Sequence, residues 1–287
     1  MNTAWQPFAG YALDDGAGPV ILSVPHAGRE YPLPLRAALR VPVEALRPLE
    51  DRHVDALALA ARRDETLLVQ RQARAWIDLN RAEHERDPVI DSGADRHAAP
   101  HASAKLRGGL GLVPRRVPGV GEIWRRQLDG EEVNARILRD YRPYHAALAG
   151  ALTRARARYG VAVLLDIHSM PPLGKGLPQI VLGDRFGRSA AARFVHRIDA
   201  VAAHAGLSTA LNTPYAGGHI LDRHARPAGG VHAIQIEFDR SLYLDAALDR
   251  PGAGLNATAT LLRAMIAALA DEALAPGDDR FAAIAAE

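Results

Sequence analysis

The chain has 287 residues, of which 48% are hydrophobic and 24% are charged, and these proportions are typical of a globular protein. The formal net charge is only +2, and the basic residues are mostly arginines scattered beside acidic residues. Because no basic block is interleaved with aromatic residues, the composition argues against a nucleic-acid partner. No apolar run approaches the roughly 20 residues that cross a bilayer, so we expect no membrane partner.

Cysteine is absent, which excludes disulfides, a thiolate nucleophile and cysteine-ligated zinc. The N-terminal residues lack the basic segment and apolar core of a signal peptide, so we expect a cytoplasmic enzyme. Any metal must be bound by histidine, aspartate or glutamate, and the chain has 12 histidines. Neither a repeat nor a linker divides the sequence, which predicts a single domain over residues 1–287.

The first predicted strand is the apolar run 19–24, and a Pro-His-Ala-Gly turn presents His26 at its carboxyl end. Residues 33–48 contain several prolines and are expected to be irregular. From Glu50 the pattern is helical. Asp51 stands near the start of this helix, where an aspartate acts either as a cap or as a carboxylate ligand. One face of the helix is apolar and comprises Val54, Leu57, Ala58 and Ala61.

Two further strands are predicted at residues 66–69 and 75–79. The second is followed directly by Asn80 and Arg81. Arginine presents a planar fork that binds a carboxylate through two hydrogen bonds, and asparagine adds a neutral donor. This pair is therefore a candidate substrate-binding site.

The stretch from residue 83 to residue 118 is rich in glycine, proline, alanine and charge, and it shows little periodicity. His97 and His101 lie in it, and nearby prolines and glycines indicate that both are loop residues. Long loops inside compact domains are commonly lids, binding loops or disordered segments. Residues 83–118 are therefore a candidate lid.

The most informative strand follows two predicted helices. The first covers residues 121–140 with an interruption near Gly130, and the second covers residues 143–159. Residues 161–170 form an apolar run that contains Asp166 and His168 near its end. This pattern predicts a buried parallel strand, and ligands bind at the carboxyl ends of such strands. His168 is therefore a candidate metal ligand, and a hydrogen-bonded structural histidine is the alternative.

Residues 179–183 are expected to form a strand, and residues 189–205 a helix. The loop 211–219 then contains Gly217 and Gly218. Glycines permit backbone close to a ligand or unusual dihedral angles, so this pair is a candidate substrate-binding element, with a plain turn as the alternative.

In the predicted strand 231–238, apolar residues alternate with Gln235 and Glu237, which therefore share one face. A glutamate that points inward at a strand end is a candidate general base. Arg240 follows and is expected to pair with a nearby carboxylate. Residues 255–270 are rich in alanine and leucine and predict a helix that packs on the sheet.

Together, these polar residues follow the ends of four predicted strands, which share one rim in a largely parallel sheet. Two histidines and a carboxylate form a catalytic zinc site with a position left for water. Zinc lowers the pKa of this water to about 7, and a nearby glutamate can accept the proton. An arginine at the same rim would anchor an anionic substrate.

Seven short stretches of the chain resemble motifs of the N-formylglutamate amidohydrolase family. They occur in the expected order between Pro19 and Tyr243. The stretches are Ser23–Gly28, Asp51–His53, Ile77–Arg81, Asp140–His145, Asp166–Met170, Tyr215–Gly218 and His232–Glu237.

The resemblance implies a three-layer α/β/α fold with a largely parallel or mixed central sheet, of the phosphorylase/hydrolase-like kind and similar to zinc carboxypeptidases and aspartoacylase-like deacylases. It implies that His26 and His168 bind one Zn²⁺ or another divalent metal, and that Glu237 activates water. The stretch Asp78–Arg81 also resembles the one that holds a substrate carboxylate in aspartoacylases.

The third metal ligand is expected to depart from the carboxypeptidase pattern His-x-x-Glu, because Arg29 stands three residues after the first histidine. A more distant carboxylate is then required. Asp51 is the choice because it belongs to a matching Asp-x-His stretch, with Asp55 and His53 as alternatives.

The function implied is hydrolysis of the formamide bond of N-formyl-L-glutamate, or of a related small anionic N-acyl amino acid, as in histidine degradation. The products are formate and the free amino acid. The alternatives are a deacylase or carboxypeptidase-like peptidase with the same zinc site, and a non-catalytic protein that binds a small anion.

Overall fold

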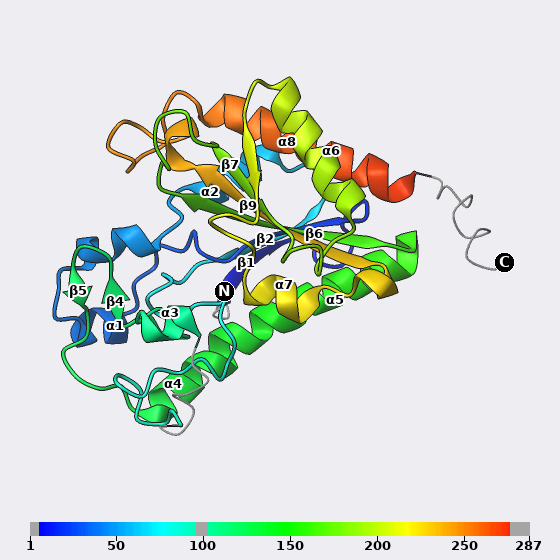
Figure 1. The fold of residues 1–287 in the computed structure, drawn as a ribbon. Helices are drawn as coiled ribbons and strands as arrows, with labels where there is room; N and C mark the ends of the chain where they lie inside the picture. The colour runs from blue at the N-terminus through cyan, green and yellow to red at the C-terminus, as the bar shows by residue number, and fades with distance from the viewer. Residues whose placement is uncertain (1–5, 96–102, 276–287) are drawn as a thin grey trace, which may run out of the picture.

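A seven-stranded mixed sheet forms the centre of the computed structural model, which describes residues 6–95 and 103–275 (Figure 1). The strand order is β1-β3-β2-β6-β9-β7-β8. Strands β3, β2, β6 and β9 are parallel, whereas β1 is antiparallel to β3 and β7 is antiparallel to β9. The strands are β1 (Phe8–Tyr11), β2 (Val20–Val24), β3 (Thr66–Gln70), β6 (Ala162–Met170), β7 (Ile180–Gly183), β8 (Thr209–Leu211) and β9 (Val231–Asp239).

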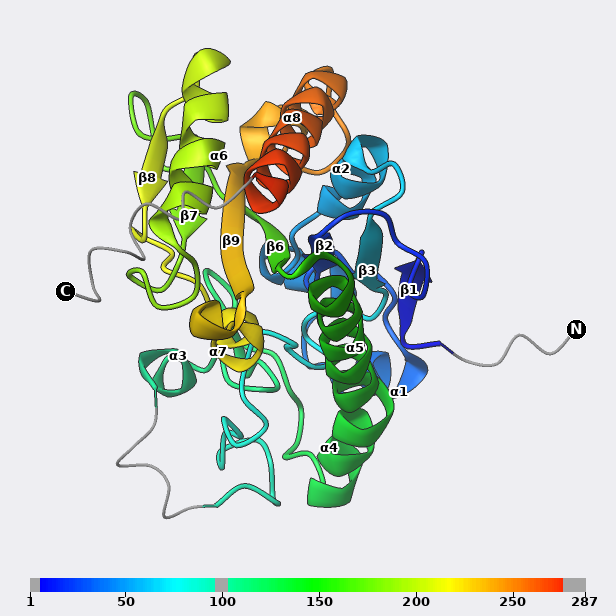
Figure 2. The ribbon, with the colours of Figure 1, turned by 90° about the vertical axis from the view of Figure 1, so that its right-hand side faces the viewer.

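Helices cover both faces of the sheet, as the two views in Figures 1 and 2 show. One face packs against α2 (Val54–Ala61), α6 (Ala192–His204) and α8 (Leu255–Leu274). The other face packs against α5 (Arg142–Tyr159) and α7 (His219–His224). The expected three-layer α/β/α fold is therefore confirmed. Within the two described ranges, no helix is long and apolar enough to cross a bilayer.

Side-chain alternation along the central strands decides which face carries the polar residues. In β6, Val163, Leu165 and Ile167 pack into the core beneath α2, α6 and α8. Because successive side chains point to opposite faces, Asp166 and His168 lie on the α5 side. The parallel register places Gln235 of β9 beside Asp166, and Glu237 beside His168. Two neighbouring strands thus present four polar side chains on one face.

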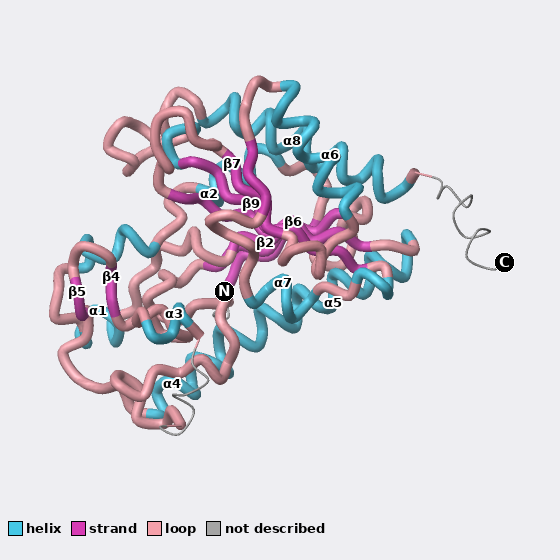
Figure 3. Tube along the Cα trace, in the orientation of Figure 1, coloured by secondary structure: helices cyan, strands magenta, loops and turns pink. Residues whose placement is uncertain are grey.

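The predicted strand at residues 75–79 is wrong. The segment is largely buried and consists of turns and coil. In Figure 3, loops and turns of this kind are coloured pink. Strand β3, which precedes it, is already flanked by β1 and β2, so no edge beside β3 is free for another strand. Its backbone bonds to loops instead, for example from Asp78 N to Leu112 O at 2.7 Å. Strand β1, which occupies that edge, was not predicted.

Other elements of the structure differ from the predicted ones in where they begin or in their type. Residues 33–48 contain α1 (Leu33–Ala38) and most of the 3-10 helix η1 (Val43–Leu49), not irregular chain alone. The helix expected from residue 121 begins only at α4 (Gly130–Arg136), where the Asp129 side chain caps it by accepting a hydrogen bond from Glu131 N. A small hairpin precedes it, formed by β4 (Arg116–Val117) and β5 (Gly121–Glu122).

The candidate lid is described in two parts, residues 83–95 and 103–118, and contains α3 (Ala104–Arg107). His97 and His101 lie outside the described residues. Lys105, Leu110 and Pro118 of this segment border the cavity described below. Whether the segment acts as a lid stays a prediction.

Candidate active site

A cavity of about 430 Å³ lies at the carboxyl ends of the central strands. Polar strand ends meet there because β2, β6 and β9 run in the same direction. Its lining includes every predicted site residue: His26, Asp51, Asn80, Arg81, His168, Gly217, Gly218 and Glu237.

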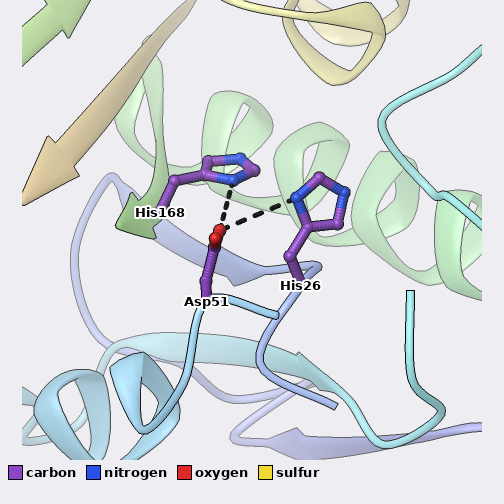
Figure 4. A group of neighbouring side chains, drawn as sticks. All are labelled: His26, Asp51 and His168. Atoms are coloured by element: carbon purple, nitrogen blue, oxygen red, sulfur yellow. Dashed lines mark hydrogen bonds and ion pairs between the residues drawn. The ribbon is translucent and has the colours of Figure 1, made fainter. Parts of the chain in front are cut away.

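Two histidines and one carboxylate converge on a single point in this cavity (Figure 4). The Nδ1 atom of His168 lies 3.0 Å from Oδ2 of Asp51, and the Nδ1 atom of His26 lies 3.7 Å from the same oxygen. One ligand atom from each residue lies within 4.8 Å of the other two. The set is therefore spaced to hold one metal ion.

Each histidine is backed by its own buried carboxylate. Nε2 of His26 lies 2.7 Å from Oδ1 of Asp78, and Nε2 of His168 lies 2.8 Å from Oδ2 of Asp166. An ionised carboxylate only accepts hydrogen bonds, so each Nε2 is the donor, which leaves Nδ1 available for a ligand. Carboxylates behind the ring are typical of metal-binding histidines.

The two backing carboxylates are themselves held in place. Asp78 accepts hydrogen bonds from Arg74 Nε and from Asn80 N, both at 2.8 Å. Burial opposes the charge of Asp78, but Arg74 and the neighbouring His26 outweigh it and lower the pKa of Asp78 well below its usual value. Asp166 accepts from the hydroxyl of Ser23 at 2.6 Å. Both carboxylates are therefore oriented before any ligand binds.

Asp51 reaches the histidines because it stands in the turn that leads into α2. Its backbone N–H donates to the carbonyl of His26 at 3.0 Å, which ties this turn to the end of β2. Burial disfavours its charge, but the adjacent imidazole rings of His168 and His26 lower the pKa of Asp51 well below its usual value. Arg240 also contacts Asp51, with 3.3 Å between Nη2 and Oδ1. The carboxylate that pairs with Arg240 is therefore distant in the sequence, whereas we expected a local one.

The two alternative third ligands lie elsewhere. Asp55 forms a two-point ion pair with Arg29, with N–O distances of 3.0 and 2.8 Å. His53 adopts a left-handed backbone conformation just before α2 and is not part of the converging group. The structure thus brings Asp51 to the histidines, while its role as a ligand stays a prediction.

Glu237 lies on the same wall of the cavity and is 6% exposed. Its Oε1 accepts a hydrogen bond from Gln235 Nε2 at 2.8 Å. Burial raises the pKa of Glu237 to about 7, against the opposing effect of His168. A carboxyl group with such a pKa can exchange a proton near neutral pH, which suits a general base or acid.

Asn80 and Arg81 reach the cavity from the turn segment that replaces the predicted strand. Asn80 Oδ1 accepts from Ile220 N at 2.9 Å, which fixes the start of α7. Arg81 donates from Nε to Leu110 O at 2.8 Å and from Nη1 to Asn80 O at 2.7 Å. These bonds hold the guanidinium group at the cavity wall without neutralising its charge.

Glycine is required at positions 217 and 218, on the other wall of the cavity, for two different structural reasons. Gly217 has φ of +100°, a conformation that L side chains rarely adopt. Gly218 instead makes a close approach, because a Cβ atom built there would lie 2.3 Å from Oδ1 of Asn80. The backbone of Gly218 also donates to Gln235 Oε1 at 3.1 Å, so the loop is joined to the strand that carries Glu237.

The substitution Gly218→Ala is expected to destabilise the protein by about 1–3 kcal/mol, as overpacking does in a well-packed site. The φ of −104° suits alanine, so the cost arises from the close contact with Asn80 and not from backbone strain. Asn80 is held by its own hydrogen bonds and is only 4% exposed, so it cannot move away freely. Urea unfolding measures the change. Gly229→Ala is the control, since its Cβ would meet its nearest neighbour at 3.7 Å, and equal effects of both substitutions would refute the explanation.

Comparison with known proteins agrees with the geometry of this site. A sequence model described as "N-formylglutamate amidohydrolase" matches residues 18–244. The chain belongs to this family. The matched residues include the converging histidines, Asp51 and Glu237.

Two relatives named N-formylglutamate deformylase have similar lengths. The protein of Pseudomonas aeruginosa is 30% identical over 278 residues, which is 93% of this chain and 97% of that protein. The protein of Pseudomonas putida is 33% identical over 243 residues, which is 82% and 85% of the two chains. A crystal structure of an N-formylglutamate amidohydrolase from Ralstonia eutropha is 33% identical, covers 94% of this chain and 98% of its own, and has a TM-score of 0.81.

The sequence analysis did not predict Arg74 and Lys105, which line the cavity, as site residues. It also did not assign a role to Asp78, which is buried behind His26. Arg74 and Asp78 are four residues apart, a spacing that is common for ion pairs but does not by itself indicate a site. Lys105 carries a weak signal, because the chain has only two lysines, Lys105 and Lys175.

A second group of histidines lies behind the Asn80 segment, between α5 and α7. His145, which we expected in the core or at the surface, is buried, and its Nε2 donates to Leu79 O at 3.0 Å. Its Nδ1 then accepts from His224 Nε2 at 2.9 Å. Burial lowers the pKa of His224 to about 4, and burial with the neighbouring His224 lowers the pKa of His145 well below its usual value.

Acidification is expected to destabilise the protein through this pair. The pKa of His224 is about 4 in the folded protein, whereas a histidine in the unfolded chain has a pKa near 6.5. Between these two pH values the unfolded chain binds more protons than the folded one. The free energy of unfolding therefore falls as the pH falls. For His224 the loss is about 3 kcal/mol by pH 4. Urea unfolding at several pH values should give a shallower slope for His224→Gln than for wild type. Equal slopes would contradict the assignment, and the exposed His196→Gln serves as control.

Proposed function

We propose that the protein is a metal-dependent amidohydrolase that hydrolyses the formamide bond of N-formyl-L-glutamate to formate and L-glutamate. The observation that carries the proposal is the pair of histidines whose Nδ1 atoms face one Asp51 oxygen, each backed by a carboxylate. Family membership and the names of two full-length relatives support this choice of substrate. The reaction would take place in the cytoplasm, as a step of histidine degradation.

His26, His168 and Asp51 would hold one Zn²⁺, or another divalent ion, through two nitrogen atoms and one oxygen. This donor set fits zinc, which takes three protein ligands in catalytic sites and leaves one position open. When bound, the ion supplies a Lewis acid for the acyl oxygen and an activated water.

Glu237 would accept the proton of the attacking water and then donate it to the departing amine. Its place opposite His168 in the register of β6 and β9 brings it to the rim where the water would bind. The Gln235 amide keeps Oε1 oriented and leaves the second oxygen for the proton transfer. A pKa of about 7 permits both halves of this cycle at neutral pH.

Asn80, Arg81 and the Gly217–Gly218 loop would bind the substrate opposite the metal. The Arg81 guanidinium group is the anchor for a carboxylate, because its described hydrogen bonds go to neutral carbonyl oxygens. Asp78 links this anchor to the metal site, since it contacts both Asn80 N and His26 Nε2. The substrate carboxylate and the scissile amide would thus be positioned by one segment.

The direct test is formate release from N-formyl-L-glutamate by the purified protein, compared with N-acetyl-L-glutamate and with a glutamate-terminated dipeptide. We expect formate release to be fastest with the formyl substrate. Faster turnover of the acetyl compound would instead indicate a deacylase, and cleavage of the dipeptide a peptidase. Binding of these compounds without turnover would indicate an anion-binding protein.

A further inference from the structure

Four cationic side chains line the cavity: Arg74, Arg81, Lys105 and Arg240. Two of them are neutralised by carboxylates of the protein. Arg74 donates to Asp78 at 2.8 Å, and Arg240 lies 3.3 Å from Asp51. These two cations therefore stabilise the site itself and are not free to bind an anionic ligand.

Within residues 6–95 and 103–275, no carboxylate pairs with Lys105 or with Arg81 alone. Arg81 bonds to carbonyl oxygens, and its Nε lies 4.0 Å from an Asp78 oxygen that Arg74 already occupies. Among the described residues, no side chain forms a hydrogen bond or an ion pair with the Lys105 ammonium group. Burial and the positive charges of Arg81 and Arg74 lower the pKa of Lys105. An anion would relieve this repulsion.

Lys105 is held at the cavity by contacts of α3. The Ser103 hydroxyl caps α3 by accepting from Leu106 N at 3.1 Å and donates to Glu85 Oε1 at 2.6 Å. After the helix, Leu110 N donates to Lys105 O at 2.9 Å, while Leu110 O accepts from Arg81 Nε. The backbone of Leu110 thus links the backbone of Lys105 to the Arg81 side chain.

We propose that Lys105 binds the side-chain carboxylate of the substrate and thereby makes the enzyme specific for a dicarboxylate. The inference rests on the proposed function. Arg81 takes the α-carboxylate, because Asp78 ties its segment to His26, and the α-carboxylate lies only two bonds from the scissile amide nitrogen. Arg81, which shares Asp78 with Arg74, and Lys105, which pairs with no carboxylate among the described residues, thus match the two negative charges of N-formyl-L-glutamate.

The test compares N-formyl-L-glutamate with N-formyl-L-glutamine, in which an amide replaces the side-chain carboxylate. For Lys105→Met, the ratio of kcat/KM between the two substrates should fall about 10- to 100-fold, as expected for one charge-assisted hydrogen bond, with most of the change in KM. Lys105→Arg should retain most of the preference. Lys175→Met is the matched control, since Lys175 is the other lysine and is exposed outside the cavity.

A second measurement uses the wild-type protein and does not depend on turnover. Mild lysine acylation followed by peptide mass spectrometry gives the labelling rates of Lys105 and Lys175. Glutarate should slow labelling of Lys105 at least several-fold and leave Lys175 unchanged. An unchanged preference in Lys105→Met, or equal labelling with and without glutarate, would overturn the inference. Absence of formate release by wild type would refute the proposed function instead, while glutarate protection would still report on Lys105.

Discussion

The substitution Glu237→Gln is expected to lower kcat for N-formyl-L-glutamate about 10²- to 10⁴-fold, the range measured for loss of a positioned general acid or base. Glutamine has the same shape, and its Oε1 can still accept the hydrogen bond from Gln235. The fold and the metal content should therefore remain those of wild type. Formate release under saturating substrate measures the effect, and metal analysis of the same sample checks the site.

The pH dependence of formate release distinguishes a catalytic role of Glu237 from a purely structural one. Glu237 acts as a base only when ionised, so activity should rise with pH through its pKa, for which about 7 is an upper bound because a bound cation lowers it. In Glu237→Gln this rising limb should disappear. Glu131→Gln on the exposed surface of α4 is the matched control and should behave as wild type. Residual activity above about one tenth, with the limb retained, would exclude Glu237 as the base.

Removal of the metal is expected to abolish formate release, with at least about a 10³-fold loss of kcat, because both the Lewis acid and the activated water disappear. Chelation followed by dialysis prepares the metal-free protein, and added Zn²⁺ should restore activity. His168→Ala should not recover, because it would lack one of the proposed ligands and removes the imidazole that contacts both Asp166 and Asp51. Full activity of a metal-free sample would refute the mechanism.

Metal binding should also raise the melting temperature of the protein. A ligand that binds only the folded state raises the free energy of unfolding, so the wild-type melting temperature should fall on chelation and rise again with Zn²⁺. The His168→Ala protein should show no such response. His196→Ala is the matched control, since His196 is exposed on α6 and outside the converging group. A zinc response in His168→Ala equal to that of wild type would exclude His168 as a ligand.

Several elements of the fold follow from local patterns. Strands β2, β6 and β9 were predicted nearly to their ends, because fully apolar runs and period-two alternation are properties of neighbouring residues. The helix α5 ends at Gly160 as expected, since its φ of +77° suits a glycine. The polar residues at these strand ends could be named for the same reason.

Short local patterns failed where the neighbouring chain decides the conformation. Residues 75–79 have the composition of a strand, yet β1 occupies the sheet edge where they might have paired, and their backbone bonds to loops instead. The sequence favoured Asp51 as the third ligand but left Asp55 as an alternative. The ion pair between Asp55 and Arg29 distinguishes them, and it requires the turn after β2 to pack beside α2.

The sequence by itself determined the layered α/β fold, the strands that carry His168 and Glu237, and the motifs of an amidohydrolase family. Only the tertiary structure decided that one Asp51 oxygen faces both histidines and that Asp78 backs His26 across 52 residues. The tertiary structure also decided that Arg74 and Arg240 of the cavity pair with Asp78 and Asp51, whereas Lys105 pairs with no carboxylate among the described residues. The physical reason is that alternation and capping act between neighbouring residues, whereas hydrogen bonds and charge pairing depend on segments that only folding brings together.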